Sequence, residues 1–389
     1  MSGGIKKLET PGRTYFGAGA SSKIVEVVDH YSAKKVFVVT DKGVRRAGLL
    51  DTLLGLLRET RAKIGVFDGT ESEPTVKSVA AATEAIADAG GSDLIISLGG
   101  GSVMDVAKCA NVVHMNGGSI LDYEDGISNP KTARRILPHV AIPTTAGTGS
   151  EATVWAVFID PKRKFKTGIQ NPGLIANVAI LDPEMTRTMP ANVTAATGMD
   201  ALTHAIEAYV SVYANPLTEA YCVRAISLAA RSLRKAVKDG DDIGARSDML
   251  LSSYMAGSAF SNSSLGIVHT LAEAMGGYYR IPHGMTNALM LPHVMEFNLK
   301  ASTDKFAEIA NLMGARTAGL GKRDAALLSV KAVSRLCDDV GLPRRLRDVG
   351  VMREDFRNLV DIADRWANLS GNPREISRSQ IEHLYKKAY

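Results

Sequence analysis

One aspartate and three histidines in the second half of the chain have the types and spacing that suit a single metal ion. Asp200 and His204 stand four residues apart in a helix-forming stretch, so both side chains lie on one face about one turn apart. His269 lies in a later helical stretch. His283 follows it in a segment bounded by glycine and proline, which we expect to be a loop that can fold back onto that helix. A helix cap at Asp200 and ordinary buried histidines are the alternative.

The types of donor atom limit which metals could bind and which chemistry they could support. One carboxylate and three imidazoles, without a thiolate, suit Fe(II), Zn(II), Co(II) or Ni(II). If solvent or substrate completes the coordination sphere, such an ion acts as a Lewis acid on an alcohol or carbonyl oxygen. We expect His293, ten residues beyond His283, to be structural.

Two segments that follow strand-like runs have the composition of nucleotide-binding loops. In residues 99–105, three consecutive glycines let the backbone approach a ligand, and the free N–H groups of the helix that follows suit a phosphate. In residues 144–151, four hydroxyl side chains among small residues offer short hydrogen-bonding groups. A tight strand-to-helix turn and a solvated loop are the respective alternatives.

A third candidate for nucleotide binding is Asp41, which follows the strand-like run 35–40. Its carboxylate could accept hydrogen bonds from a ribose diol and would repel a 2′-phosphate, which favours NAD over NADP. Asp41 could equally cap the helix that begins after it.

The elements that must position these residues change in kind near the middle of the chain. The runs 35–40, 63–67, 93–98 and 139–143 are rich in β-branched residues, and several are apolar throughout, which is typical of strands covered on both faces. Helical periodicity in 80–89 and 103–113 supplies crossovers between parallel strands. After Pro190 only long helical stretches remain. The sequence therefore predicts an α/β domain with a parallel sheet in residues 1–187 and an all-α metal-binding domain in residues 188–389.

Composition excludes several classes of protein. The 389 residues are enough for two domains, and 45% hydrophobic with 22% charged residues is ordinary for a soluble globular chain. Lysine and arginine exceed aspartate and glutamate only by 46 to 41, and the excess is scattered, so we expect no nucleic-acid partner. No apolar run approaches the ~20 residues that span a bilayer, and no export signal is evident, so we expect no membrane partner and a cytoplasmic location. Three separated cysteines predict neither disulfides nor a thiolate zinc site.

Taken together, these motifs resemble the iron-containing (group III) alcohol dehydrogenases. The matching segments occur in the same order over nearly the whole chain: residues 99–108, 143–153, 198–209, 256–269, 282–297, 372–374 and 381–389. The resemblance implies a dinucleotide-binding α/β domain, an all-helical metal domain and an active site in the cleft between them. It also implies hydride transfer between a small alcohol or aldehyde and NAD at Fe²⁺ or another divalent ion, in a homodimer or larger homo-oligomer.

The resemblance also assigns residues. The family's metal ligands fall on Asp200, His204, His269 and His283. Its cofactor contacts fall on Asp41, Gly100, Gly101, Ser102, Asp105, Thr144, Thr145, Thr148 and Lys166.

This chain departs from the family pattern near the expected substrate. Many relatives carry a second histidine where this chain has Glu273, four residues after His269. We expect Glu273 to act with His269 at the catalytic centre, as a proton relay or as the carboxylate partner of that histidine, although it could merely pair with a cation. Trp155 and Phe260 could narrow the substrate pocket, and Arg280 could recognise an anionic substrate, with simple core packing and a surface ion pair as the alternatives.

Two other functions fit part of the sequence. The related glycerol dehydrogenase and dehydroquinate synthase group combines a similar cofactor half with a metal, but the synthase catalyses a lyase reaction without net redox change. A protein that binds a nucleotide or stores a metal would take up NAD without consuming alcohol.

Overall fold

The computed structural model describes residues 5–163, 165–279, 281–365 and 367–389. These residues form two compact units. The first, here called the α/β unit, contains Thr10–Thr145 and Ser150–Met189. The second, here called the helical unit, contains Pro190–Tyr389, the short segment Ala146–Gly149 and the segment that ends at Glu9.

A six-stranded parallel sheet is the centre of the α/β unit, as the apolar runs predicted. Its strand order is β1-β8-β5-β4-β2-β3, and each pair of neighbours is parallel. The strands are β1 (Arg13–Phe16), β2 (Lys35–Val39), β3 (Lys63–Phe67), β4 (Leu94–Gly99), β5 (His139–Pro143) and β8 (Val178–Leu181).

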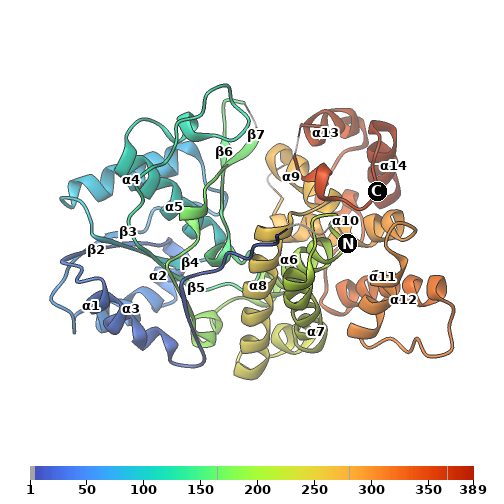
Figure 1. Cartoon of the computed structure of the whole chain (residues 1–389), viewed down its shortest axis with the longest axis horizontal. Coiled ribbons are helices and arrows are strands. Elements are labelled where there is room, and N and C mark those ends of the chain that lie inside the picture. Colours follow the sequence, from blue (N-terminus) through green and yellow to red (C-terminus); the bar gives the residue numbers. More distant parts are fainter. Residues whose placement is uncertain (1–4, 164, 280, 366) are drawn as a thin grey trace. The chain divides into compact units, whose positions relative to one another are not determined.

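Helices cover both faces of this sheet (Figure 1). The helices are α1 (Ile24–His30), α2 (Lys42–Arg46), α3 (Leu49–Leu57), α4 (Val76–Asp88) and α5 (Gly101–Asn116). Alternate side chains of β2 separate into two cores: Val36 and Val38 pack with α1 and α3, whereas Phe37 and Val39 pack with α4 and α5. Burial on both faces explains why β2 lacks polar alternation.

A second, antiparallel sheet of the α/β unit was not predicted. It is a hairpin of β6 (Trp155–Asp160) and β7 (Phe165–Gln170). Ala156, Phe158 and Ile169 of this hairpin are buried in the same core as α4 and α5. The hairpin therefore extends that core beyond the main sheet.

The second half of the chain is helical, as predicted. Its helices are α6 (Ala191–Val210), α7 (Pro216–Lys238), α8 (Ile243–Ser263), α9 (Ile267–Tyr279), α10 (His283–Asn298), α11 (Thr303–Leu312), α12 (Lys322–Asp339), α13 (Phe356–Ala363) and α14 (Arg378–Ala388). α6 packs against α7, α8 and α10, and nearly all of its residues are buried. One local expectation was wrong: His283 does not lie in a loop but begins α10, with Pro282 as the N-terminal cap.

Two further findings concern the whole described chain. Among the described residues, no helix combines the length and apolar character that crossing a membrane requires. Cys109, Cys222 and Cys337 are buried and unpaired with one another.

Candidate metal centre and nucleotide loops

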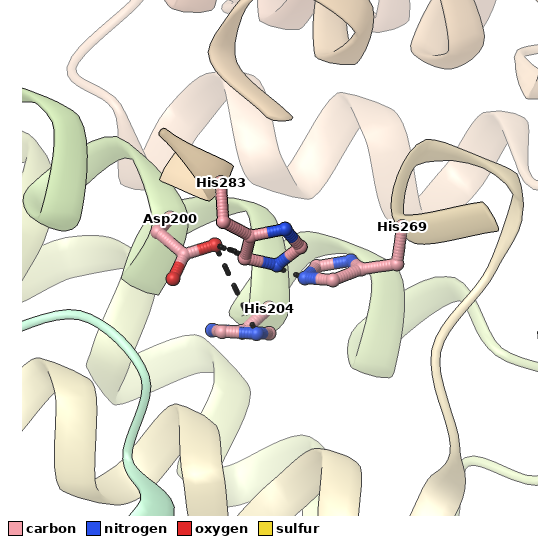
Figure 2. A group of neighbouring side chains, drawn as sticks. All are labelled: Asp200, His204, His269 and His283. Atoms are coloured by element: carbon pink, nitrogen blue, oxygen red, sulfur yellow. Dashed lines mark ion pairs between the residues drawn. The ribbon is translucent and has the colours of Figure 1, made fainter. Parts of the chain in front are cut away.

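The structure brings the four predicted metal ligands together inside the helical unit (Figure 2). Asp200 and His204 come from α6, His269 from α9 and His283 from α10. One potential ligand atom from each side chain lies within 4.8 Å of the other three. Asp200 Oδ1 is 3.9 Å from His204 Nε2 and 3.8 Å from the Nε2 atoms of both His269 and His283. Residues separated by more than eighty positions thus converge on one small volume.

A close approach of two helices positions His283. A Cβ atom on Gly284 would lie 2.3 Å from the backbone oxygen of Ala196 and 3.3 Å from Asp200 Cβ. Only a residue without a side chain allows the start of α10 to approach α6 this closely. The glycine therefore holds His283 beside Asp200.

Glu207 positions His269, and no sequence motif had identified Glu207 for this role. Its buried carboxylate accepts a hydrogen bond from His269 Nδ1 at 2.6 Å and another from the backbone N–H of Val268 at 2.6 Å. With the Nδ1 proton held by Glu207, Nε2 of His269 faces the centre and would bind a cation after giving up its own proton. Glu207 follows His204 by three residues in α6, so the helical spacing contained a signal for this role.

His204 is held by a backbone carbonyl and by two rings. Its Nδ1 donates to the carbonyl oxygen of Gly147 at 3.2 Å, which leaves Nε2 to face Asp200. Its ring stacks on Phe260 at 4.5 Å and on His269 at 4.4 Å between centroids. Phe260, predicted in the substrate pocket, is thus placed against a candidate metal ligand.

The charges at this centre fit a divalent cation. Burial opposes ionisation of Asp200, yet the three imidazoles hold the pKa of its carboxyl well below the ordinary range. Burial lowers the pKa of His204 to about 3, so that ring is neutral. Burial also disfavours the charged form of His269, but Asp200 and Glu207 outweigh it and raise the pKa of His269 to about 9. An ionised carboxylate in a buried place needs a positive partner, and these donors suit Fe(II) and similar ions.

Glu273 lies near a different histidine from the one expected. Glu273 Oε1 is 3.8 Å from His283 Nδ1, whereas the carboxylate partner of His269 is Glu207. The idea that Glu273 supports His269 is therefore corrected, because Glu207 already occupies that place. Glu273 is buried, beside a candidate ligand.

Asn287 is a further polar side chain at the centre. It follows His283 by one turn of α10 and is fully buried. Its Nδ2 is 2.6 Å from Asp200 Oδ1 and 3.1 Å from the Nε2 atoms of both His269 and His283. No pattern in the sequence had singled it out.

In the α/β unit, the predicted nucleotide loops meet at one edge of the sheet. Asp41 follows β2, Gly100 and Gly101 follow β4, and Thr144 and Thr145 follow β5. These three strands are adjacent and parallel, so their carboxyl ends share an edge, which is where ligands bind in open α/β sheets.

The glycine loop is a narrow backbone cradle. A Cβ atom on Gly100 would lie 3.1 Å from the side chain of Thr145, and α5 begins at Gly101 with its N-terminal N–H groups. This geometry suits a pyrophosphate. Asp41 Oδ1 caps α2, accepting from the N–H groups of Gly43 and Val44 at 2.6 and 2.9 Å.

The buried side chain of Lys108 holds the end of the second nucleotide loop, residues 144–151, in place. Lys108 Nζ lies 2.6–3.2 Å from five oxygen atoms of Ser150, Thr153 and Trp155. Asp105 fixes the same segment, since it accepts from Ser150 Oγ at 2.8 Å and from the N–H of Val157 at 3.2 Å. Burial raises the pKa of Asp105 and lowers that of Lys108 to about 8.

The remaining predicted residues are placed as follows. Ser102 Oγ donates to the carbonyl of Ser72 at 2.5 Å. Lys166 Nζ lies 3.5 Å from Glu73 Oε2. Thr148 belongs to the helical unit, and Trp155 begins β6 in the α/β unit. Arg280 lies outside the described residues.

Two family descriptions match the chain. Residues 11–183 match "Iron-containing alcohol dehydrogenase", and residues 194–389 match "Fe-containing alcohol dehydrogenase family, C-terminal". The chain is 41% identical over 383 residues to a 1,3-propanediol dehydrogenase of Citrobacter freundii, covering 97% of each protein. It is 38% identical over 378 residues to an NAD-dependent methanol dehydrogenase of Bacillus methanolicus, covering 97% of this chain and 98% of that protein.

Solved structures give the same likeness. A crystal structure of a 1,3-propanediol oxidoreductase matches with a TM-score of 0.95 and 39% identity, covering 99% of this chain and 100% of that one. A sulfoacetaldehyde reductase from Bifidobacterium kashiwanohense, solved in complex with NAD⁺, matches with a TM-score of 0.88 and 30% identity over 99% of each chain.

Proposed function

Because the chain belongs to the iron-containing alcohol dehydrogenase family, we propose that it transfers a hydride between a small alcohol, or the corresponding aldehyde, and NAD at a divalent metal centre. The protein is an oxidoreductase that acts on alcohols. The single observation that carries the site assignment is the convergence of Asp200, His204, His269 and His283 in the helical unit.

These four side chains would hold Fe²⁺ or another divalent ion. Such an ion, when bound, supplies Lewis acidity that lowers the pKa of an alcohol hydroxyl. Glu207 keeps His269 in the tautomer that presents Nε2. Phe260 stacks on the ring of His204, and both side chains are buried. Glu273, beside His283, would take up and pass on the hydroxyl proton.

The loops at the sheet edge would bind NAD. Gly100, Gly101 and Ser102 would receive the pyrophosphate at the start of α5. Asp41 would face the ribose, since one carboxylate oxygen caps α2 and the other is available for a diol. Thr144, Thr145, Thr148, Asp105 and Lys166 remain proposed cofactor contacts. Trp155, Phe260 and Arg280 remain proposed substrate contacts.

We also propose a cytoplasmic location and a homo-oligomer, with a homodimer as the simplest form. Three cysteines without a disulfide are typical of a reducing compartment, and the oligomeric state follows the family resemblance. Light scattering during size-exclusion chromatography measures the number of subunits.

The test compares two histidines of the same helix. We expect His283→Ala to lose the bound metal and to lower kcat/KM for aldehyde reduction by about 10³-fold, since Lewis-acid stabilisation contributes several kcal/mol. NAD binding, followed by fluorescence, should be retained. His293→Ala removes a histidine of α10 that is outside the ligand group and serves as the control.

Three results would contradict the proposal. One is turnover that survives removal of the metal by a chelator, and another is equal activity in the two variants. The third is consumption of substrate without net formation of NADH or NAD⁺, which would instead indicate lyase chemistry of the dehydroquinate synthase kind.

A further inference from the structure

A strained turn leads into the helix that carries His269. α8 ends at Ser263, and Ser264 follows it with φ 64° and ψ 175°, a backbone conformation that is ordinarily left to glycine. α9 begins at Ile267, and His269 is its third residue. A strained turn keeps its shape only where its surroundings hold it, so the contacts around this turn determine where His269 lies.

Two side chains from distant parts of the chain cap the start of α9. The first N–H groups of a helix have no partner within the helix, and Gly266, which precedes α9, has no side chain to offer them. The N–H of Val268 donates to Glu207 Oε1 at 2.6 Å. The N–H of Ile267 donates to Asn372 Oδ1 at 3.4 Å. A Cβ atom on Gly266 would lie 2.9 Å from both oxygens, so the two side chains enclose the backbone where α9 begins.

Asn372 is itself fixed to the end of α10. Its amide and that of Asn298, the last residue of α10, form two reciprocal hydrogen bonds of 2.8 Å. Its Nδ2 also donates to the carbonyl oxygen of Arg374 at 2.6 Å. The guanidinium of Arg374 donates to the carbonyl of Phe297 at 2.9 Å and lies 4.0 Å from the centre of its ring. Both asparagines are buried, where hydrogen bonds are stronger than in water.

Gly371 allows the same segment to reach the strained turn. A Cβ atom on Gly371 would overlap the backbone oxygen of Leu265 and would lie 3.1 Å from Ser264 Oγ. The N–H of Val212, just beyond α6, donates to the carbonyl oxygen of Gly371 at 3.0 Å. Residues 371–374 therefore contact the turn before α9, the end of α10 and the chain that follows α6.

We propose that Asn372 is a positioning residue for the metal centre: it ties the start of α9 to the end of α10 and so holds His269 where it meets the other ligands. α10 carries His283 as its first residue. The bonds from Asn372 to Asn298 and to α9 therefore fix the two histidines relative to each other. The proposal rests on the metal site of the proposed function, and it gives a role to residues 372–374.

Amide hydrogen exchange and metal affinity of the full-length protein test this together. In metal-free Asn372→Ala we expect the amides of the first turn of α9 to exchange about 10-fold faster, since they lose a fixed partner. The Kd for Co²⁺, measured by competition with a chromophoric chelator, should rise about 10-fold, because residues that orient a metal ligand typically affect affinity by that order.

Asn111→Ala is the matched control. Asn111 is a buried asparagine of α5, in the α/β unit, and bonds to both backbone groups of Leu137. Its loss should lower the free energy of unfolding without changing the exchange of α9 or the Kd for Co²⁺. Asn298→Ala is the second variant, in case Asn372→Ala does not fold. It leaves the oxygen of Asn372 at α9 but removes the tie to α10, and we expect both quantities to change in the same direction by a smaller factor.

An unchanged Kd in Asn372→Ala, or in Asn298→Ala where only that variant folds, overturns the proposal. It does so even if exchange is faster, because the amide then supports α9 without orienting His269. An equal rise of the Kd in Asn111→Ala also overturns it, since the effect is then one of general stability. If the wild type does not bind Co²⁺, the metal site of the proposed function fails, and this proposal fails with it. If only the variants behave otherwise than expected, the proposed function stands.

Discussion

Each imidazole of the metal centre has a different neighbour at its outer nitrogen. His204 Nδ1 donates to the carbonyl of Gly147, and His269 Nδ1 donates to the carboxylate of Glu207. His283 Nδ1 lies 3.8 Å from the carboxylate of Glu273. A carboxylate partner raises the basicity of a ligating imidazole more than a carbonyl does. The three nitrogens that face Asp200 are therefore not equivalent.

Removing the charge next to His269 should weaken metal binding. We expect Glu207→Gln to raise the Kd for the metal about 10- to 100-fold, because an amide can present its N–H₂ group to Nδ1 and no longer fixes the tautomer. Glu308→Gln is the control, since Glu308 accepts from Tyr209 outside the centre. An unchanged Kd in Glu207→Gln would show that the 2.6 Å contact does not orient His269 for a metal.

Glu273 is expected to act on the proton rather than on the metal. Glu273→Gln should lower kcat by about 10²-fold and remove one limb of the pH–rate profile, as loss of a general acid or base does. The Kd for the metal should change little. Turnover and a pH profile equal to those of the wild type would refute this role.

At the residue scale, sequence spacing indicated the metal ligands but not the side chains that form hydrogen bonds with them. The four-residue interval of Asp200 and His204, together with the family resemblance, was sufficient to indicate the metal group. Glu207 and Asn287 follow His204 and His283 by three and four residues, yet glutamates and asparagines at such intervals are common in helices. Only the distances to His269 and Asp200 distinguish them.

At the element scale, one buried carboxylate near the second nucleotide loop should affect stability. Glu151 belongs to the short turn Ser150–Ala152 and is buried, and its Oε1 has no hydrogen-bond partner among the described residues. Burial raises the pKa of Glu151 to about 7 from the ordinary 4.5, although Lys108 opposes the rise. The protonated form is therefore the one that the folded protein favours.

The sign of the pH effect follows from that shift. The folded protein binds the Glu151 proton more tightly than the unfolded chain, so this contribution to stability is complete below pH 4.5 and is lost as pH rises through 7. Glu151→Gln stays neutral. Between pH 4.5 and 7, its free energy of unfolding relative to the wild type should rise by up to about 3 kcal/mol.

Denaturant unfolding at several pH values measures this difference. Glu84→Gln, an exposed glutamate of α4, is the control and should show no such trend. A constant difference between Glu151→Gln and the wild type over this range would mean that folding does not raise the pKa of Glu151.

The elements were predictable where their pattern is strong and local. Continuous apolar runs identified β2, β4 and β5, because burial on both faces removes polar residues from a strand. β1 was missed because its four residues are mostly exposed and carry no such pattern. The β6–β7 hairpin was missed because it is antiparallel within a region that otherwise follows a parallel pattern. The start of α10 was mistaken for a loop, since a proline followed by a histidine and a glycine is typical of turns.

At the scale of the whole molecule, the two kinds of chemistry belong to different units. All four candidate metal ligands, with Glu207 and Asn287, lie in the helical unit, whereas Asp41, the glycine loop and Thr144 lie in the α/β unit. Within the helical unit, Ala146–Gly149 packs closely: a Cβ on Gly149 would lie 2.6 Å from the backbone oxygen of Ser253. The sequence does not show that Ala146–Gly149 belongs with the helical unit, because Ser253, to which the N–H of Gly149 donates, is about one hundred positions away.

Bound metal and bound NAD should therefore each slow amide hydrogen exchange in the unit that binds them. A saturating metal should slow exchange in α6, α9 and α10, by up to about 100-fold at 100 times its Kd, since binding stabilises the folded form. NAD added alone should slow exchange in the segments after β2, β4 and β5. Metal-induced protection of those segments, without any in α9 and α10, would contradict the placement of the metal.

The distribution of ligands along the chain has a consequence for biosynthesis. Asp200 and His204 leave the ribosome long before His269 and His283, so a nascent chain offers incoming ions only an incomplete pair. The centre becomes complete when α10 has docked onto α6, and metal capture is then the last step of maturation. Until that step, the amide of Asn287 lies within hydrogen-bond distance of three would-be ligand atoms.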